Sequence, residues 1–393
     1  MTEPMPDDAK RAKRVALIAS VSVFLVGVAA ILVWALVAKP GASNSAEQPE
    51  FEPAEPTAEA TLPVVPSTPP SGSASATSGS APASSSGPAV TTPTGFTRAS
   101  KLAFRLGGSV YVAAEDGSGA VAVARVPQGP YALSPDARTL AVVESGSLVL
   151  YDVATGRRTP VGPAELSAPV WSPDSSAVLY VRLSSSAGGT PEVWRVSASG
   201  TGTKRLEAGM EGAVSADGRT TVIRPLDAGY SSPADASRLL VSVDGGFEPI
   251  SLPGQPTAIA VGRDRVYVGL VDAKGEPSII SVAFDGSSIK KVLGAPPGGS
   301  GAVWGKLTLS SDGARLAVAA TGDDGHSRVR VVPAGGGTST DLTPRRDAEI
   351  HGWSATGDVL FLREGNSYQG ETTALISVRP DGTKRTIVVT GAQ

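Results

Sequence analysis

The chain contains no cysteine and only two histidines in 393 residues. Without cysteine it cannot form a disulfide, a thiolate metal site or a cysteine nucleophile, and it cannot carry a lipid on an N-terminal cysteine. A Ser-His-Asp site would need His326 or His351 as its base, and no Gly-x-Ser-x-Gly elbow occurs in the sequence. Two histidines without cysteine also argue against a zinc site.

Excess charge is absent too, because the net charge is only −3. A nearly neutral chain lacks the positive footprint that binds a phosphate backbone, so we expect no nucleic-acid partner. The pair Asp323-Asp324 lacks the alternating oxygen ligands of a calcium loop. Gly305-Lys306 lacks the glycine spacing and the following Ser or Thr of a phosphate loop. The sequence therefore predicts no catalytic residue, no metal and no cofactor.

Residues 15–38 form the longest apolar stretch, with no charged residue. As a helix this stretch is about 36 Å long, enough to cross a hydrocarbon core of about 30 Å. Four cations precede it, and only Lys39 follows closely, so residues 1–14 are predicted to be a cytoplasmic tail. The alternative is a cleaved signal peptide, but its apolar region is normally only about 7–15 residues. We favour a single-pass anchor in the cytoplasmic membrane, with the rest of the chain extracytoplasmic.

Residues 39–98 are rich in Pro, Ser, Ala and Thr. Between Gly41 and Thr97 they include five glutamates and no basic residue. Such a composition buries too little apolar area to offset the entropy of ordering the chain. We expect a disordered linker that holds the remaining residues, 99–393, away from the membrane.

A four-residue phrase recurs in residues 99–393, each time between two short apolar stretches. Successive serines of the phrase are separated by about forty residues, except for one interval of about twice that length. The copies are Leu133-Ser134-Pro135-Asp136, Trp171-Ser172-Pro173-Asp174, Val214-Ser215-Ala216-Asp217, Leu309-Ser310-Ser311-Asp312 and the degenerate Trp353-Ser354-Ala355-Thr356. A period in the low forties is typical of one four-stranded propeller blade. The chain is therefore predicted to be all-β, a seven-bladed β-propeller, with six or eight blades as the alternatives.

Two of the seven units lack the phrase. A degenerate fifth unit is expected between the third and fourth copies, with Gly262-Arg263-Asp264 in place of the turn. The first unit shows only its second to fourth strands, from Lys101 to Val126. To close the ring, either Gly95 to Arg98 or the C-terminal strand Thr386 to Val389 is expected to complete this blade.

The phrase and its surroundings resemble the TolB-like (WD40-like) β-propeller repeat of cell-envelope proteins. Trp171 to Asp174 followed by Lys204-Arg205-Leu206, and Leu309 to Asp312 followed by Asp341-Leu342-Thr343, carry the resemblance. The resemblance implies a propeller over the C-terminal part of the chain. It does not by itself imply one activity, because propellers host binding, scaffolding and catalysis.

Two sets of repeated residues have both a structural and a functional interpretation. The aspartates Asp136, Asp174, Asp217 and Asp312 either fix the strand-to-strand turns or line a metal or substrate channel. We favour the turn, because Asp and Ser accept hydrogen bonds from nearby amides. Trp171 and Trp353 precede the turn, and we expect them to pack between blades rather than to bind sugar.

These features predict a non-catalytic binding or scaffold module for a protein or an envelope polymer. The alternative is an envelope hydrolase or lyase that uses acidic residues at the mouth of the propeller. A ligand sensor is a third option, although a tail of about fourteen residues holds no output domain.

Overall fold

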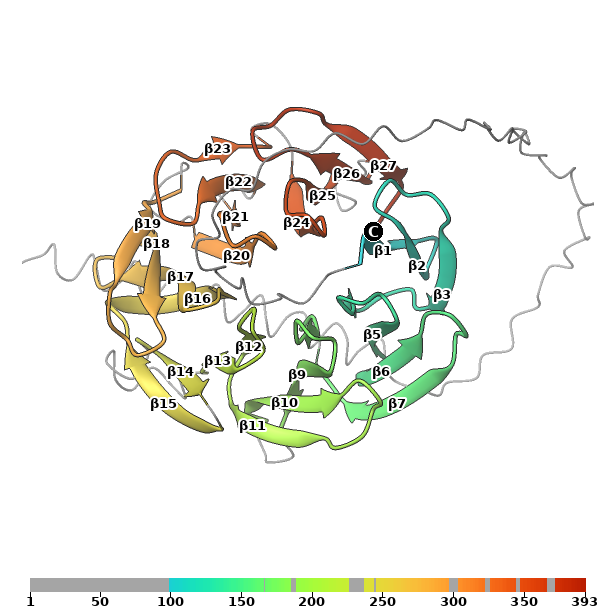
Figure 1. The fold of residues 1–393 in the computed structure, drawn as a ribbon, viewed down its shortest axis with the longest axis horizontal. Helices are drawn as coiled ribbons and strands as arrows, with labels where there is room; N and C mark the ends of the chain where they lie inside the picture. The colour runs from blue at the N-terminus through green and yellow to red at the C-terminus, as the bar shows by residue number, and fades with distance from the viewer. Residues whose placement is uncertain are drawn as a thin grey trace, which may run out of the picture. The chain divides into compact units, whose positions relative to one another are not determined.

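The computed structural model describes residues 99–165, 167–184, 189–225, 237–243, 245–296, 303–321, 326–343, 347–365 and 372–393. They form seven antiparallel sheets, which follow one another along the chain and stand around a common axis (Figure 1). This confirms the predicted all-β, seven-bladed propeller. Within these residues no helix is long and apolar enough to cross a membrane, and the predicted anchor, residues 15–38, lies outside them.

The sheets are named blades 1 to 7 in chain order. Blade 1 contains β1 (Lys101–Leu106), β2 (Ser109–Ala114) and β3 (Val121–Arg125). Blade 2 contains β4 (Tyr131–Leu133), β5 (Thr139–Glu144), β6 (Ser147–Asp152) and β7 (Arg158–Pro163). Blade 3 contains β8 (Val170–Trp171), β9 (Ala177–Leu183), β10 (Pro191–Ser197) and β11 (Lys204–Ala208). Blade 4 contains β12 (Glu211–Val214), β13 (Thr220–Arg224), β14 (Arg238–Val243) and β15 (Gly246–Ser251).

Blade 5 contains β16 (Gly254–Val261), β17 (Arg265–Asp272), β18 (Pro277–Ala283) and β19 (Lys290–Leu293). Blade 6 contains β20 (Val303–Leu309), β21 (Arg315–Thr321), β22 (Ser327–Pro333) and β23 (Thr340–Asp341). Blade 7 contains β24 (Ala348–Trp353), β25 (Leu360–Glu364), β26 (Ala374–Val378) and β27 (Thr386–Thr390). Blade 5 is the degenerate unit that the sequence predicts, and the amide of Gly262 donates to the carbonyl of Arg265 in its substitute turn.

The position of a strand within its blade explains its residue pattern. The second strand of a blade is covered on both faces by the neighbouring sheets, so it is a continuous apolar run, as in β21. The fourth strand is outermost and alternates between exposed and half-buried residues, as in β7. The sheets therefore bury apolar area only when they stand side by side, as propeller blades do.

The hydrophobic core consists of seven clusters, and each cluster lies at the boundary between two neighbouring blades. The boundary between blades 6 and 7 has twelve buried residues among those described, including Trp353. The boundary between blades 3 and 4 has only four, namely Leu179, Val181, Val193 and Ile223. The blade 3–4 boundary is thus the most thinly packed part of the described core.

Among the described residues, blade 7 and blade 1 meet where the ring closes, and neither shares a strand with the other. β27 pairs with β26, so the C-terminal strand completes blade 7, and the expectation that it completes blade 1 is wrong. The other candidate, Gly95 to Arg98, lies outside the described residues. Instead, the amide of Gln393 donates to the carbonyl of Arg105 (2.9 Å), and His351 Nε2 donates to the carbonyl of Ala103 (2.6 Å).

Candidate functional site

The repeated Ser-x-Asp phrase forms the turn between the first and second strands of blades 2, 3, 4 and 6. In blade 3, Ser172 Oγ donates to Asp174 Oδ1 (2.6 Å) and accepts from the amide of Ala177 (2.9 Å). Asp174 Oδ1 also accepts from the amide of Ser176 (3.0 Å). The same bonds recur at Asp136, Asp217 and Asp312. In blade 7 the Ser354 hydroxyl donates to Asp358 instead (3.0 Å).

These bonds occupy one carboxylate oxygen of each turn aspartate within the turn itself. Burial alone raises the pKa of Asp174, Asp217 and Asp312, but the serine and amide hydrogen bonds outweigh it and lower the pKa. The carboxylates are therefore held in the charged form by the turns. Within the described ranges no group of three or more His, Asp or Glu side chains could hold a metal ion, and Asp323-Asp324 lies outside these ranges.

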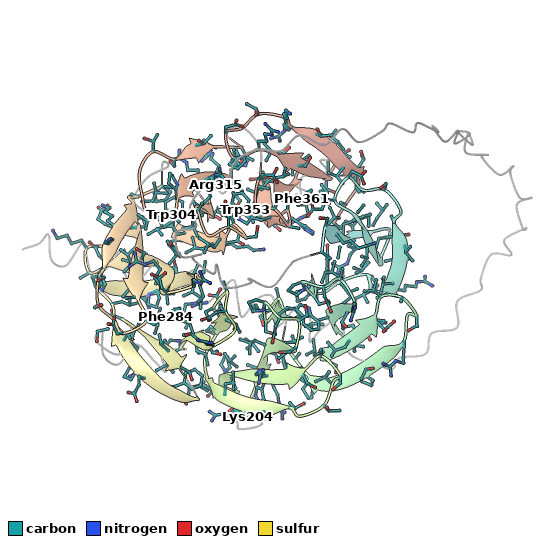
Figure 2. The ribbon with its side chains drawn as sticks, in the orientation of Figure 1. Lys204, Phe284, Trp304, Arg315, Trp353 and Phe361 are labelled. Atoms are coloured by element: carbon teal, nitrogen blue, oxygen red, sulfur yellow. The ribbon has the colours of Figure 1, made fainter. Side chains whose placement is uncertain are left out.

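Trp171 and Trp353 lie at blade boundaries. Trp171 is in the cluster of blades 2 and 3, and its Nε1 donates to the carbonyl of Ala132 (3.0 Å). Trp353 is in the cluster of blades 6 and 7, and its Nε1 donates to the carbonyl of Thr308 (3.2 Å; Figure 2). Neither indole ring is free to stack on a sugar.

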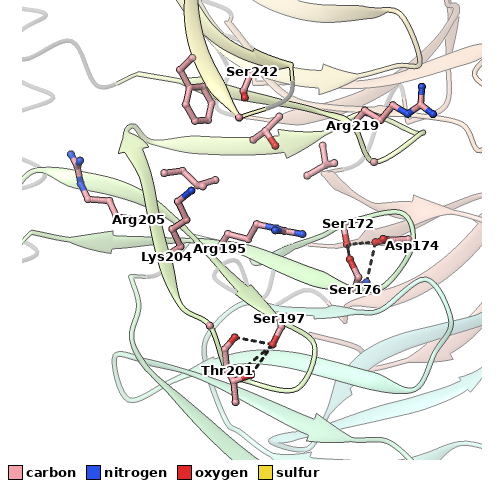
Figure 3. A pocket seen from close by; sticks show the side chains of 17 residues that line it. Ser172, Asp174, Ser176, Arg195, Ser197, Thr201, Lys204, Arg205, Arg219 and Ser242 are labelled. Atoms are coloured by element: carbon pink, nitrogen blue, oxygen red, sulfur yellow. Dashed lines mark hydrogen bonds between the residues drawn. The ribbon is translucent and has the colours of Figure 1, made fainter.

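A groove of 490 Å³ lies between blades 3 and 4, at the end of the propeller that carries the Ser-x-Asp turns (Figure 3). In an antiparallel meander the first and third connections lie at the same end, so each blade contributes a turn and a hairpin to this groove. Blade 3 contributes Ser172, Asp174 and Ser176 from its turn, and Ser197 and Thr201 from its hairpin. Its other lining residues are Arg195, Gly202, Lys204, Arg205, Leu206, Val214, Gly218, Arg219, Thr221, Ser242, Gly245 and Phe247.

The groove is strongly cationic. Four cations line it against one carboxylate, Asp174, which already accepts two hydrogen bonds within its turn. Arg205 is paired with Glu192 (2.8 Å), but Arg195, Lys204 and Arg219 are exposed and their side chains make no hydrogen bond or ion pair to the described residues. Figure 3 shows Arg195 and Lys204 on one wall and Arg219 on the other. The groove therefore offers three positive charges that form no ion pair with the described residues, of which Arg219 also lies near the Asp217 carboxylate and helps to lower its pKa.

A second groove, of 520 Å³, occupies the equivalent place between blades 6 and 7. Its cations Arg315 and Arg379 are matched by two lining carboxylates, Asp358 and Asp381. Arg315 also lies 3.7 Å from Asp312 Oδ2. Equivalent positions of the repeat therefore differ in charge, and only the blade 3–4 groove has a surplus of cations among the described lining residues.

The innermost strands carry a separate set of charged residues. On β12, Glu211 pairs with Arg224 (3.1 Å), and burial raises the pKa of Glu211 although Arg224 opposes this. On β20, Lys306 Nζ donates to the carbonyl of Ile350 (2.8 Å), and burial lowers its pKa although solvent reaches the side chain. Glu349 on β24 pairs with Arg363 (2.6 Å). Lys306 is thus both accessible to solvent and surrounded by protein, as a residue in a concave part of the surface is.

The sequence predicts that the aspartates lie in the turns and that the tryptophans lie between blades, but it does not predict that cations gather in one groove. In the sequence Lys204 and Arg205 stand out only as part of the segment that carries the TolB-like resemblance, and no motif includes Arg195 or Arg219. Arg195 lies on β10 and Arg219 follows the turn of the next blade, so no local pattern links them. The signal available is the contrast between repeat units, since the equivalent groove between blades 6 and 7 pairs its cations with carboxylates.

No family model matches the chain, and no curated protein matches it. Solved structures that it resembles include TolB from Acinetobacter baumannii, at 20% identity over 72% of this chain and 62% of that chain, with a TM-score of 0.46. Another is one of two prolyl endopeptidases described for their inter-domain dynamics, at 19% identity over 74% of this chain and 48% of that chain, with a TM-score of 0.53. A third is prolyl oligopeptidase B from Galerina marginata, at 14% identity over 72% and 47%, with a TM-score of 0.53.

These likenesses concern the fold alone. The chain spans about half the length of the peptidases and 62% of TolB. TolB structures are among the solved structures that the chain resembles, and peptidase structures also share its propeller fold. Because propellers host binding, scaffolding and catalysis, function has to be argued from the site.

Proposed function

We propose that this chain is a membrane-tethered, extracytoplasmic binding module that holds a protein or an envelope polymer in the groove between blades 3 and 4. The observation that carries the proposal is the set of exposed cations Arg195, Lys204 and Arg219 around a preformed groove, none of which forms an ion pair with the described residues. The apolar stretch at residues 15–38 supplies the anchor, and residues 39–98 supply the linker.

The groove is suited to recognition because its polar groups are held on rigid elements. Arg195 lies on β10 and Lys204 begins β11, so strand pairing fixes both backbones. The Ser215–Asp217 bonds fix the turn before Arg219. Charged groups placed in this way steer an oppositely charged partner and set its orientation. A partner that presents carboxylate or phosphate groups fits this groove. The groove of blades 6 and 7 attracts such a partner less, because its cations are balanced by carboxylates.

A photo-crosslinking amino acid at Thr201, in the groove, is expected to capture a partner in native membranes. The double variant Arg195→Glu, Lys204→Glu should lower the yield of this adduct by about tenfold, which corresponds to 1.4 kcal/mol of binding free energy. The adduct is measured by immunoblotting of irradiated membranes.

The matched control places the same amino acid at Thr338, which lines the groove of blades 6 and 7. Arg379→Glu in that groove should leave the Thr201 adduct unchanged. Equal adducts from Thr201 and Thr338, or an adduct that survives the double charge reversal, would show that the cationic groove is not the binding site.

A second candidate function is hydrolysis of an envelope peptide or glycan, favoured by the raised pKa of Glu211 near the axis. A carboxyl group whose pKa is raised by burial is suited to act as a general acid. If it does so, Glu211→Gln should abolish cleavage of cell-wall fragments by the full chain, while Glu207→Gln on the outermost strand β11 leaves it intact. Product release followed by mass spectrometry tests this, and equal rates for the two variants would remove the candidate.

A further inference from the structure

The groove joins two blades across the most thinly packed boundary of the described core. Four buried residues form the cluster there, against twelve between blades 6 and 7. The backbone of β12 lies directly on blade 3, since a Cβ at Gly212 would come within 2.8 Å of Val193 Cγ1 and 3.2 Å of Leu179 Cδ1. Small side chains at this boundary bring the backbones together and leave space toward the turn end.

The residue before the turn of blade 4 lines the groove. Blades 3 and 7 carry Trp171 and Trp353 at this repeat position, and both indoles pack at a boundary. Blade 4 carries Val214 there, and Val214 lines the groove. A tryptophan in place of Val214 would add a much larger side chain to the lining.

The lining is chemically mixed. Besides the cations it includes Leu206, Val214 and Phe247, together with six hydroxyl side chains. One wall is formed by β11, the last strand in the order of its sheet, which has no further strand paired to its outer edge among the described residues. Such an edge offers backbone donors and acceptors to an added extended segment. A ligand that carries charge alone would use the cations and leave the apolar residues and the edge unused.

We propose that the groove takes an extended acidic polypeptide segment with interspersed apolar side chains, which bridges blades 3 and 4. Its carboxylates pair with Arg195 and Lys204 on one wall and with Arg219 on the other. Its apolar side chains contact Leu206, Val214 and Phe247. This ligand class rests on the proposed binding function and deepens it.

The test is fluorescence anisotropy with the full chain in detergent micelles and a labelled peptide of alternating Glu and Val. The peptide is expected to bind, with an affinity that falls as salt rises. Arg195→Glu and Arg219→Glu should each weaken binding by about tenfold, because the ligand contacts both walls. Arg379→Glu, in the charge-balanced groove, is the matched control and should change the affinity less than twofold.

A filling variant tests the same site without altering a charge. Val214→Trp introduces the side chain that blades 3 and 7 tolerate at this repeat position, so the propeller should keep its circular dichroism spectrum and lose peptide binding. Retained binding in a folded Val214→Trp variant would place the peptide elsewhere. Loss of binding in Arg195→Glu but not in Arg219→Glu would refute the bridge between blades.

A second probe separates the ligand class from the function. Inorganic polyphosphate, which has charge but no apolar side chain, should bind more weakly than the peptide. If it binds as tightly, and with the same sensitivity to Arg195→Glu, the groove is a general polyanion site and the polypeptide assignment is wrong, although the chain remains a binding module. If neither probe binds while the Thr201 adduct forms and depends on the cations, only the ligand class fails. If the adduct is also absent, the proposed function fails.

Discussion

Replacing Trp353 by alanine is expected to destabilise the propeller by about 3–5 kcal/mol. The side chain is only 2% exposed and packs among residues of blades 6 and 7. The substitution removes the apolar area that the indole buries and leaves a cavity between two sheets. It also leaves the carbonyl of Thr308 without the hydrogen bond that it accepts from Nε1. The midpoint of urea unfolding, followed by circular dichroism of the full chain in detergent, measures the loss.

The matched control is Ile387→Ala on the outermost strand β27, where the side chain is 64% exposed. This change removes a large apolar side chain without opening a cavity, so it should alter stability by less than about 0.5 kcal/mol. Equal unfolding midpoints for the Trp353 variant and the unmodified chain would mean that the indole does not hold blades 6 and 7 together.

The number and order of the blades follow from the sequence because the signals are local. A second strand covered on both faces must be apolar throughout, and a turn that needs hydrogen-bond acceptors selects Ser and Asp, so both features repeat with the period of the blade. Even blade 5, which lacks the phrase, keeps its four strands, because its apolar runs retain their spacing.

The closure of the ring and the groove depend on contacts between blades, which a local pattern does not encode. The sequence predicts that either Gly95 to Arg98 or the C-terminal strand completes blade 1, and it does not decide between them. β27 pairs with β26, its neighbour in sequence, because a short hairpin costs less loop-closure entropy than a connection to another sheet. The groove is lined by Arg195 and Arg219 on different sheets and by Val214, whose repeat position holds tryptophan in blades 3 and 7 and leucine in blades 2 and 6. None of these residues is unusual for its own strand or turn.

Binding and packing are linked at this boundary. A blade boundary that is filled with many buried side chains gains stability, as around Trp353 between blades 6 and 7. The boundary between blades 3 and 4 has fewer buried residues among those described, and it carries the cationic groove. A ligand that bridges the two walls would restore contact between the blades, and by linkage it should raise the unfolding temperature of the chain.

Gly129→Ala is expected to destabilise the propeller by about 3–4 kcal/mol, although it adds a single methyl group. Gly129 connects blade 1 to blade 2 with φ of 105°, a conformation that side chains with a Cβ rarely adopt. An added Cβ would also collide with the carbonyl oxygen of Val143. This backbone is fixed, because the amide of Val143 donates to the carbonyl of Pro130 (2.9 Å), and the Gly129 carbonyl accepts from the Arg105 guanidinium.

Gly146→Ala, in the β5–β6 hairpin of blade 2, separates the two causes. Gly146 has φ of 73° and nothing within 4 Å of an added Cβ, so this variant carries the conformational strain without the collision. Its expected loss is about 1–2 kcal/mol, and the difference between the two unfolding free energies measures the steric term at Gly129. An equal loss of unfolding free energy in the two variants would contradict the steric term. It would mean that the connection between blades 1 and 2 moves to accommodate the methyl group, and that the packing there is looser than the contacts of Gly129 indicate.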